Sequence, residues 1–247
     1  MNTFSQYTVI TRIAEGQWHA LEDDQVVGRG HASRRPDGRT FLGIDAWDDA
    51  VFGQLATAML ADLPRPLYTV VDEADLDLRT NWLEAGFTTR RREWEYVVPT
   101  GIVSARPPAG VTIVGFGAVQ EGPLRTLDRV IRDEVEATVG WQEMPAEILH
   151  GLDPSKYAVA AEGDRYVGLV RVTALPRQPR IGLIAVRTDR RRQGIARALL
   201  AVVLASLHQR GISTASADVN ESNRAATALF EGVGARRSSS NLELVVR

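Results

Sequence analysis

The chain has 247 residues, of which 44% are hydrophobic and 24% charged, as in water-soluble globular proteins with one large domain or two small ones. A formal net charge of -2 provides no general attraction to nucleic acid, and the absence of cysteine excludes disulfides, thiolate metal sites and cysteine nucleophiles. No run approaches the roughly 20 apolar residues of a membrane span, and the N-terminus lacks a signal-peptide pattern. We therefore expect a cytoplasmic enzyme or binding protein that holds no metal.

The first hundred residues predict a unit rich in strands. Strands are expected over 18–22, 26–33, 40–47, 67–71 and 92–98, with helices over 48–62 and 76–86. Asp48 and Asp49 suit the start of the first helix, because free N–H groups and the helix dipole favour acidic side chains there. Four tryptophans are predicted to fill the core of this unit: Trp18, Trp47, Trp82 and Trp94.

A segment rich in proline, glycine and small residues, 98–110, predicts a linker at 101–110 between a domain at 1–100 and another at 111–247. The second domain predicts strands over 111–116, 157–161, 166–174, 181–186, 214–219 and 242–246. Helices are expected over 122–139, 145–149, 193–209 and 222–231. The first half has a similar element order but lacks the long first helix.

A short alignment supports an internal repeat of one fold. When the two halves are placed against each other, four positions match in kind: Gly86 with Gly234, Asp72 with Asn220, Asp75 with Asn223 and Trp82 with Phe230.

The most informative segment joins the strand at 181–186 to the helix that follows. Arg191, Gly194 and Ala196 stand where the helix begins, and a helix start offers unpaired N–H groups and a positive dipole end to a phosphate. The small side chains let a ligand approach the main chain, and arginine can pair with phosphate oxygens. By itself, the basic run 187–192 could also be a solvated loop or a nucleic-acid patch.

Two blocks of the second half together resemble the GNAT superfamily of N-acetyltransferases. Arg191-x-x-Gly194-x-Ala196 is similar to the family's Q/R-x-x-G-x-G/A signature for acetyl-CoA. The block from Asn220 to Ala235, with Asn223, Ala226, Leu229 and Phe230, is similar to the N-x-x-A-x-x-L-Y/F-x-x-x-G-F block. The resemblance covers about 111–247 by motif and the first half only by layout.

The resemblance implies an α/β (α+β) fold of two GNAT-like units, each a mixed, mostly antiparallel sheet flanked by helices. In the C-terminal unit the fourth and fifth strands would splay apart, and acetyl-CoA would bind between them as a co-substrate. Main-chain groups at Ala185 and Val186 would hold the pantetheine arm, and Asn223 would contact the coenzyme from the opposite side. The diphosphate would lie on the loop and first helical turn: Arg191, Arg192, Gln193, Gly194, Ile195, Ala196 and Arg197.

The implied reaction is direct attack of a primary amine on the thioester, with a backbone N–H near Val186 stabilising the oxyanion. Phe230 stands where the family often has a proton-donating tyrosine, so Ser222 or water would have to protonate the thiolate, or no acid is needed. Asp133 and Glu136 share a helix face and are candidates for the base, whereas Glu134 points elsewhere. A solvated helix face is the alternative for these acids.

The first half has no glycine-rich basic loop at its strand-to-helix junction, and Asp48 and Asp49 would repel a diphosphate there. We therefore expect only the second unit to bind acetyl-CoA. The expected partner is a small-molecule or peptide amine, without nucleic acid or membrane, and a homodimer remains open. The competing hypothesis is an acyl-CoA sensor or an interaction protein without turnover.

Overall fold

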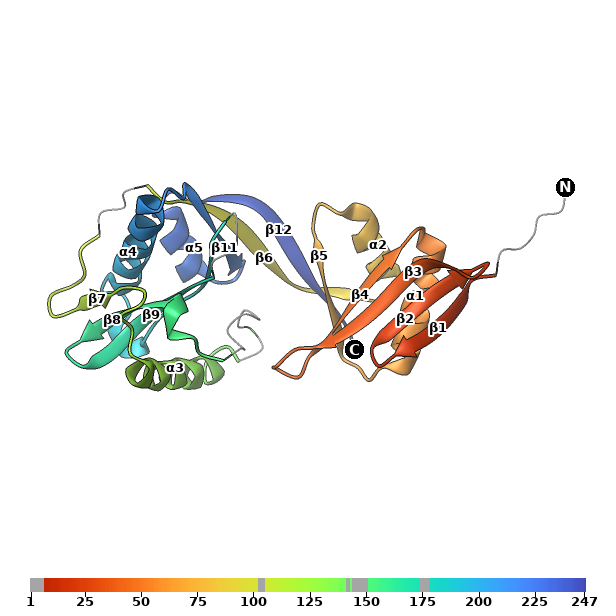
Figure 1. The fold of residues 1–247 in the computed structure, drawn as a ribbon, viewed down its shortest axis with the longest axis horizontal. Helices are drawn as coiled ribbons and strands as arrows, with labels where there is room; N and C mark the ends of the chain where they lie inside the picture. Colours follow the sequence, from red (N-terminus) through yellow and green to blue (C-terminus); the bar gives the residue numbers. More distant parts are fainter. Residues whose placement is uncertain (1–6, 102–104, 141–142, 144–150, 174–177) are drawn as a thin grey trace. The chain divides into compact units, whose positions relative to one another are not determined.

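The computed structural model describes residues 7–101, 105–140, 143, 151–173 and 178–247. The chain folds into two compact units, one made of Met1–Glu93 with Ser239–Arg247 and the other of Trp94–Ser238. These limits differ from the predicted linker at 101–110, because β6 (Thr88–Pro99) and β12 (Arg236–Val246) are long strands with residues in both units (Figure 1). The helix predicted over 145–149 lies outside the described residues.

The first unit begins with four strands that pair antiparallel in chain order: β1 (Val9–Ala14), β2 (Gln17–Glu22), β3 (Gln25–Arg34) and β4 (Thr40–Ala46). Helix α1 (Asp49–Asp62) leads to β5 (Leu67–Asp72), which is parallel to β4, and α2 (Leu76–Glu84) follows. The last strand of the chain continues this sheet, since residues 241–246 of β12 pair antiparallel with β5 and β6 follows β12 in the strand order. The sequence did not predict β1, whose side chains are mostly exposed and therefore show no apolar alternation.

The core of the first unit lies between its sheet and the two helices. Trp18 and Trp82 are each 1% exposed, and the Trp82 ring packs edge-on against Phe52 and Phe87. The prediction was wrong for the other two tryptophans. Trp47 is 75% exposed because it follows the last residue of β4, and Trp94 belongs to the second unit, where it packs against the core.

The second unit places helices on both faces of its sheet (Figure 1). Its elements are β7 (Thr112–Val114), α3 (Glu121–Glu136), a 3-10 turn η3 (Pro154–Lys156), β8 (Tyr157–Glu162), β9 (Arg165–Thr173), β10 (Arg180–Val186), a 3-10 turn η4 (Thr188–Arg190), α4 (Ile195–Gln209), β11 (Thr214–Asn220) and α5 (Arg224–Glu231). Strands β7 to β10 pair antiparallel in order, and β11 lies parallel beside β10. Leu124, Leu127 and Ile131 of α3 pack on one face, while α4 and α5 cover the other.

The structure confirms the internal repeat at the level of hydrogen bonds. Asp75 caps α2 by accepting from Leu78 N, and Asn223 caps α5 by accepting from Ala226 N. Three further pairs agree. Asp72 and Asn220 each accept a hydrogen bond at 2.9 Å from the backbone N–H two residues on, Trp82 and Phe230 are both buried, and Gly86 and Gly234 have φ values of 91° and 85°.

Candidate functional site

The two parallel strands of the second unit separate soon after they meet. β10 and β11 share one register pair, Arg180 with Ser216, whereas β9 stays paired with β10 as far as Val186. Within the described residues, the main chain of β10 beyond Gly182 therefore has no partner in β11. This is the splayed arrangement expected of the C-terminal unit, and it leaves peptide groups near Ala185 and Val186 without ladder bonds on that side.

The N-terminus of α4 is open. Gly194 is the N-cap residue with a φ of 85°, and no side chain caps the helix. The first helical bond is donated by Ala198 to the Gly194 carbonyl, so the N–H groups of Ile195, Ala196 and Arg197 have no acceptor among the described residues. A Cβ built at Gly194 would meet nothing within 4 Å, so there is open space beside this residue. Three N–H groups and the positive end of the dipole suit an anion.

The loop before α4 is held by several ionic or charge-assisted contacts. Arg190 Nε donates to both carboxylate oxygens of Glu162 at 3.0 Å, and this contact raises the pKa of Arg190. Arg187 donates to Asp189, which lowers the pKa of the Asp189 carboxyl. Arg191 Nε donates to the Val186 carbonyl at 3.2 Å.

Further contacts of the loop come from α3. The Glu134 carboxylate accepts from Thr188, by the main-chain N–H at 3.0 Å and by the hydroxyl at 2.8 Å. Nη2 of Arg191 lies 3.6 Å from the same carboxylate. Sequence reasoning placed Glu134 on a different side from Asp133 and did not name it as a candidate base.

The block that follows β11 is arranged around its two asparagines. Asn223 uses its side-chain oxygen to cap α5, so its amide NH₂ remains available to a ligand. The Ser222 hydroxyl and N–H both donate to Asn220 Oδ1 at 2.9 Å. Ser222 is therefore exposed but already engaged in a local turn.

Phe230 is buried, with 5% of its surface exposed, and stacks on Tyr96 of β6 with ring centroids 6.1 Å apart. The Tyr96 hydroxyl accepts from Arg237 Nε at 2.9 Å and lies 3.2 Å from a Glu231 oxygen. The Tyr96 hydroxyl beside Phe230 is thus engaged with Arg237 and Glu231 and is not a free replacement acid.

The candidate bases lie at the last turn of α3. Asp133 and Glu136 are both exposed, and they flank Glu134, which reaches the loop before α4. The helix therefore carries these two carboxylates close in sequence to a residue in contact with the loop before α4. Trp141, which could pack in a core or line the acceptor site, and His150, a possible base, lie outside the described residues.

Sequence reasoning missed polar residues on the α3 side of the sheet. Along β11, Ala215, Ala217 and Val219 pack into the core with α4, so alternation directs Asp218 to the opposite face. Asp218 forms an ion pair with Arg180, at the point where β10 and β11 separate. This alternation was visible in the sequence, but the partner required knowledge of the strand order.

The corresponding junction of the first unit is closed. β4 and β5 share only the register pairs Thr40 with Leu67 and Phe41 with Tyr68, so these strands also separate. The N-terminus of α1, however, is capped by Asp48, which accepts from Val51 N at 2.8 Å. Asp49 stands in its first turn and accepts from Asn81 of α2. Carboxylates thus occupy the position that is open in α4.

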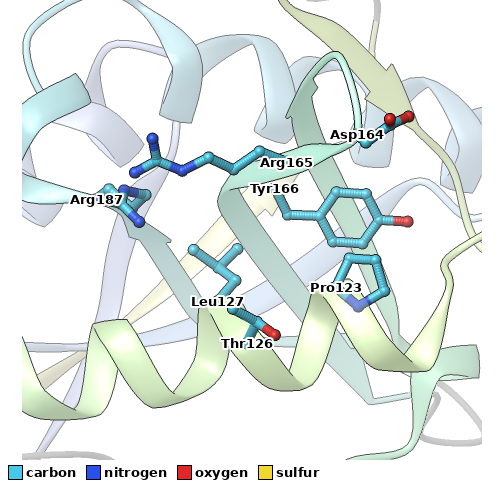
Figure 2. Close-up of a pocket in the computed structure, with 7 residues that line it drawn as sticks. All are labelled: Pro123, Thr126, Leu127, Asp164, Arg165, Tyr166 and Arg187. Carbon is cyan, nitrogen blue, oxygen red and sulfur yellow. The ribbon is translucent and has the colours of Figure 1, made fainter.

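A cavity of about 290 Å³ lies between α3 and the turn joining β8 to β9 (Figure 2). Its lining residues are Pro123, Thr126, Leu127, Asp164, Arg165, Tyr166 and Arg187. None of the predicted site residues lines it, so cavity size does not locate the site. Among the described residues, no helix is long and apolar enough to cross a membrane and no group of three or more His, Asp or Glu could hold a metal ion.

The comparisons with known proteins find a family match within the second unit. Residues 127–235 match the model of the acetyltransferase (GNAT) family. The [ribosomal protein bS18]-alanine N-acetyltransferase of Escherichia coli K12 is 47% identical over 51 residues, which are 21% of this chain and 34% of that protein. The chain thus spans about a third of the length of the curated relatives that it matches.

Solved structures share the fold of nearly the whole chain. A GCN5-related N-acetyltransferase from Sphaerobacter thermophilus has a TM-score of 0.70 at 15% identity, over 96% of this chain and 82% of that one. A tandem GNAT protein from the clavulanic acid biosynthesis pathway has a TM-score of 0.66 at 14% identity, over 93% of this chain and 82% of that one. At these identities the likeness concerns the fold alone.

Proposed function

We propose that the second unit, a domain of the acetyltransferase (GNAT) family, binds acetyl-CoA and transfers its acetyl group to a primary amine of a small molecule or peptide. The observation that carries this proposal is the uncapped N-terminus of α4, with three N–H groups that have no acceptor among the described residues and clear space at Gly194. A diphosphate fits such an end, because it accepts hydrogen bonds and is attracted by the dipole.

Each predicted coenzyme residue has a role in this proposal. Backbone N–H groups from Gln193 to Arg197 would hold the diphosphate, and the side chains of Arg191 and Arg192 would add positive charge. The main chain near Ala185 and Val186, which has no partner in β11, would pair with the pantetheine arm through groups other than the Val186 carbonyl, which accepts from Arg191. The Asn223 amide would donate from the opposite side. The coenzyme supplies the acetyl group as a thioester, which an amine can attack directly.

For the proton transfers we propose Asp133 or Glu136 as the base that receives a proton from the amine, directly or through water. Ser222 remains a candidate donor to the departing thiolate, although its hydroxyl donates to Asn220. A thiol with a pKa of about 8.5 is a tolerable leaving group, so transfer can proceed without a dedicated acid. The buried Phe230 favours a second candidate function, a sensor that binds acyl-CoA without turnover.

Two measurements test the proposal. Acetyl-CoA should raise the melting temperature of the protein, and no shift at millimolar ligand would contradict both candidate functions. Release of free CoA should then be followed with amines of several classes: polyamines, aminoglycosides, amino acids and peptides, including one that begins with alanine. Turnover with any amine identifies an enzyme, whereas a thermal shift with no CoA release across the panel favours the sensor.

The variant Phe230→Ala serves as a control for the binding measurement. It removes a core ring but none of the groups assigned to the diphosphate, so the thermal shift caused by acetyl-CoA should largely persist.

A further inference from the structure

The last turn of α3 carries a carboxylate whose contacts lie in another element. Glu134 accepts two hydrogen bonds from Thr188, the first residue of η4, at 3.0 Å from the N–H and 2.8 Å from the hydroxyl. The same carboxylate lies 3.6 Å from Nη2 of Arg191. Glu134 thus connects α3 to both ends of the short turn that precedes the open N-terminus of α4.

Glu134 does not stabilise its own helix. The C-terminal end of a helix carries the negative pole of the dipole, so an acidic side chain there is unfavourable. No basic residue stands in the last turn of α3 to offset this. Alanine has a higher helix propensity than glutamate, so α3 by itself would gain from the substitution Glu134→Ala. The contribution of Glu134 must therefore be sought in the loop.

We propose that Glu134 is a positioning residue for the coenzyme: it fixes Thr188 and orients Arg191, so that the loop enters α4 with its N–H groups aimed at the diphosphate. This inference rests on the proposed function of the second unit. It adds a residue that lies outside both sequence blocks and outside the loop itself.

Two effects of the Glu134 charge oppose each other. Its negative charge repels a diphosphate and weakens the field of Arg191, while its hydrogen bonds hold the loop in shape. The ion pair is 3.6 Å long and the Arg191 side chain is half exposed, so this pair contributes little. The bonds from Thr188 are short and charge-assisted, and the Glu134 side chain is 21% exposed. We therefore expect the positioning effect to dominate.

The experiment measures the Kd for CoA by calorimetry in the full chain. Glu134→Ala should raise the Kd about tenfold, the effect of losing hydrogen bonds to one charged group. The Kd of Glu134→Gln should lie between those of the wild type and Glu134→Ala, because the glutamine amide oxygen can still accept from Thr188. Glu121→Ala is the matched control: it removes an exposed carboxylate at the other end of α3, where it pairs with Arg125. Its Kd should match that of the wild type.

Two further readouts separate positioning from damage to the fold. The melting temperature of ligand-free Glu134→Ala should fall by no more than a few degrees, since the loss is confined to the Thr188 contacts and α3 itself loses nothing. Thr188→Val should weaken CoA binding as well. The double variant of Glu134→Ala and Thr188→Val should bind CoA no more weakly than the weaker-binding single variant, because both substitutions break the same contact.

Several outcomes would overturn the inference. A Kd for Glu134→Ala within twofold of the wild type, or a lower one, would mean that the loop does not depend on this carboxylate. Additive losses in the double variant would mean that Glu134 acts elsewhere. If the wild-type chain itself fails to bind CoA, the proposed function is lost and this inference with it, whereas normal wild-type binding with an unaffected variant refutes the inference alone.

Discussion

The substitution Gly194→Asp would test whether the open end of α4 holds a diphosphate. It places a carboxylate where α1 has one, at the N-cap of the helix that follows the separating strands. A Cβ at Gly194 meets nothing within 4 Å, so the new side chain has room beside the helix N-terminus. Gly194→Asn is the matched control, because it has nearly the same shape and no charge.

The size of the effect follows from Coulomb's law. A carboxylate about 5 Å from a phosphate charge costs about 1.7 kcal/mol at an effective dielectric constant of about 40, between the surface and bulk values. Two phosphate charges would double this, and physiological salt screens about half of it at that distance. We therefore expect the aspartate variant to bind CoA about 20-fold more weakly than the asparagine variant.

The assay is the Kd for CoA together with the melting temperature of the free protein. With a φ of 85°, either side chain strains the backbone, and Asp and Asn tolerate this region better than most residues. An acidic group at a helix N-terminus is favourable, so Gly194→Asp should be at least as stable as Gly194→Asn. Equal affinities of the two variants for CoA would refute the assignment of the diphosphate to this helix end.

Two further predictions concern the first unit. Asp48→Ala should destabilise it by about 1 kcal/mol, the usual cost of a lost N-cap, whereas Asp48→Asn should retain most of the stability; calorimetric melting curves check this, and identical curves for both variants would contradict it. Glu73 accepts from Arg92 and Ser240, and these bonds lower its pKa below the ordinary value of 4.5. A carboxyl whose pKa is lower in the folded protein than in the unfolded chain stabilises the fold at pH values above its ordinary pKa. This stability is lost as the pH falls through the lowered pKa. Glu73→Gln should therefore lose less stability than the wild type on acidification below about pH 4.5, and parallel profiles of melting temperature against pH would argue against this role.

Local patterns in the sequence predicted most of the elements. The helix of 48–62 is found as α1 and begins at its predicted Asp48 cap, and the strand of 181–186 is found as β10. These features depend on neighbours within one or two turns, so periodicity and capping residues are sufficient to reveal them. The same holds for Gly194, whose position after a strand and before a helix predicted that it stands at the helix start, where it is the N-cap residue of α4.

Long-range pairing was beyond the reach of the sequence. The pattern around 98–110 predicted a domain boundary, yet β6 runs without interruption to Pro99 and residues of β12 pair with β5. No local signal states which strand a chain terminus will join, because apolar alternation specifies a buried face and not a neighbour. The contact of Glu134 was not predicted for the same reason, because its partner, Thr188, is 54 residues away in the sequence.

The two units keep the same hydrogen bonds with different charges. Asp72 and Asp75 make the same turn and cap in the first unit that Asn220 and Asn223 make in the second. Both residue types accept from a backbone N–H, so folding does not distinguish them, and aspartate suits the helix dipole at least as well. Only a bound anion would distinguish them, because each aspartate adds a negative charge beside the separating strands. Neutral residues at these positions, together with Gly194, are thus better explained by a ligand of the second unit than by its stability.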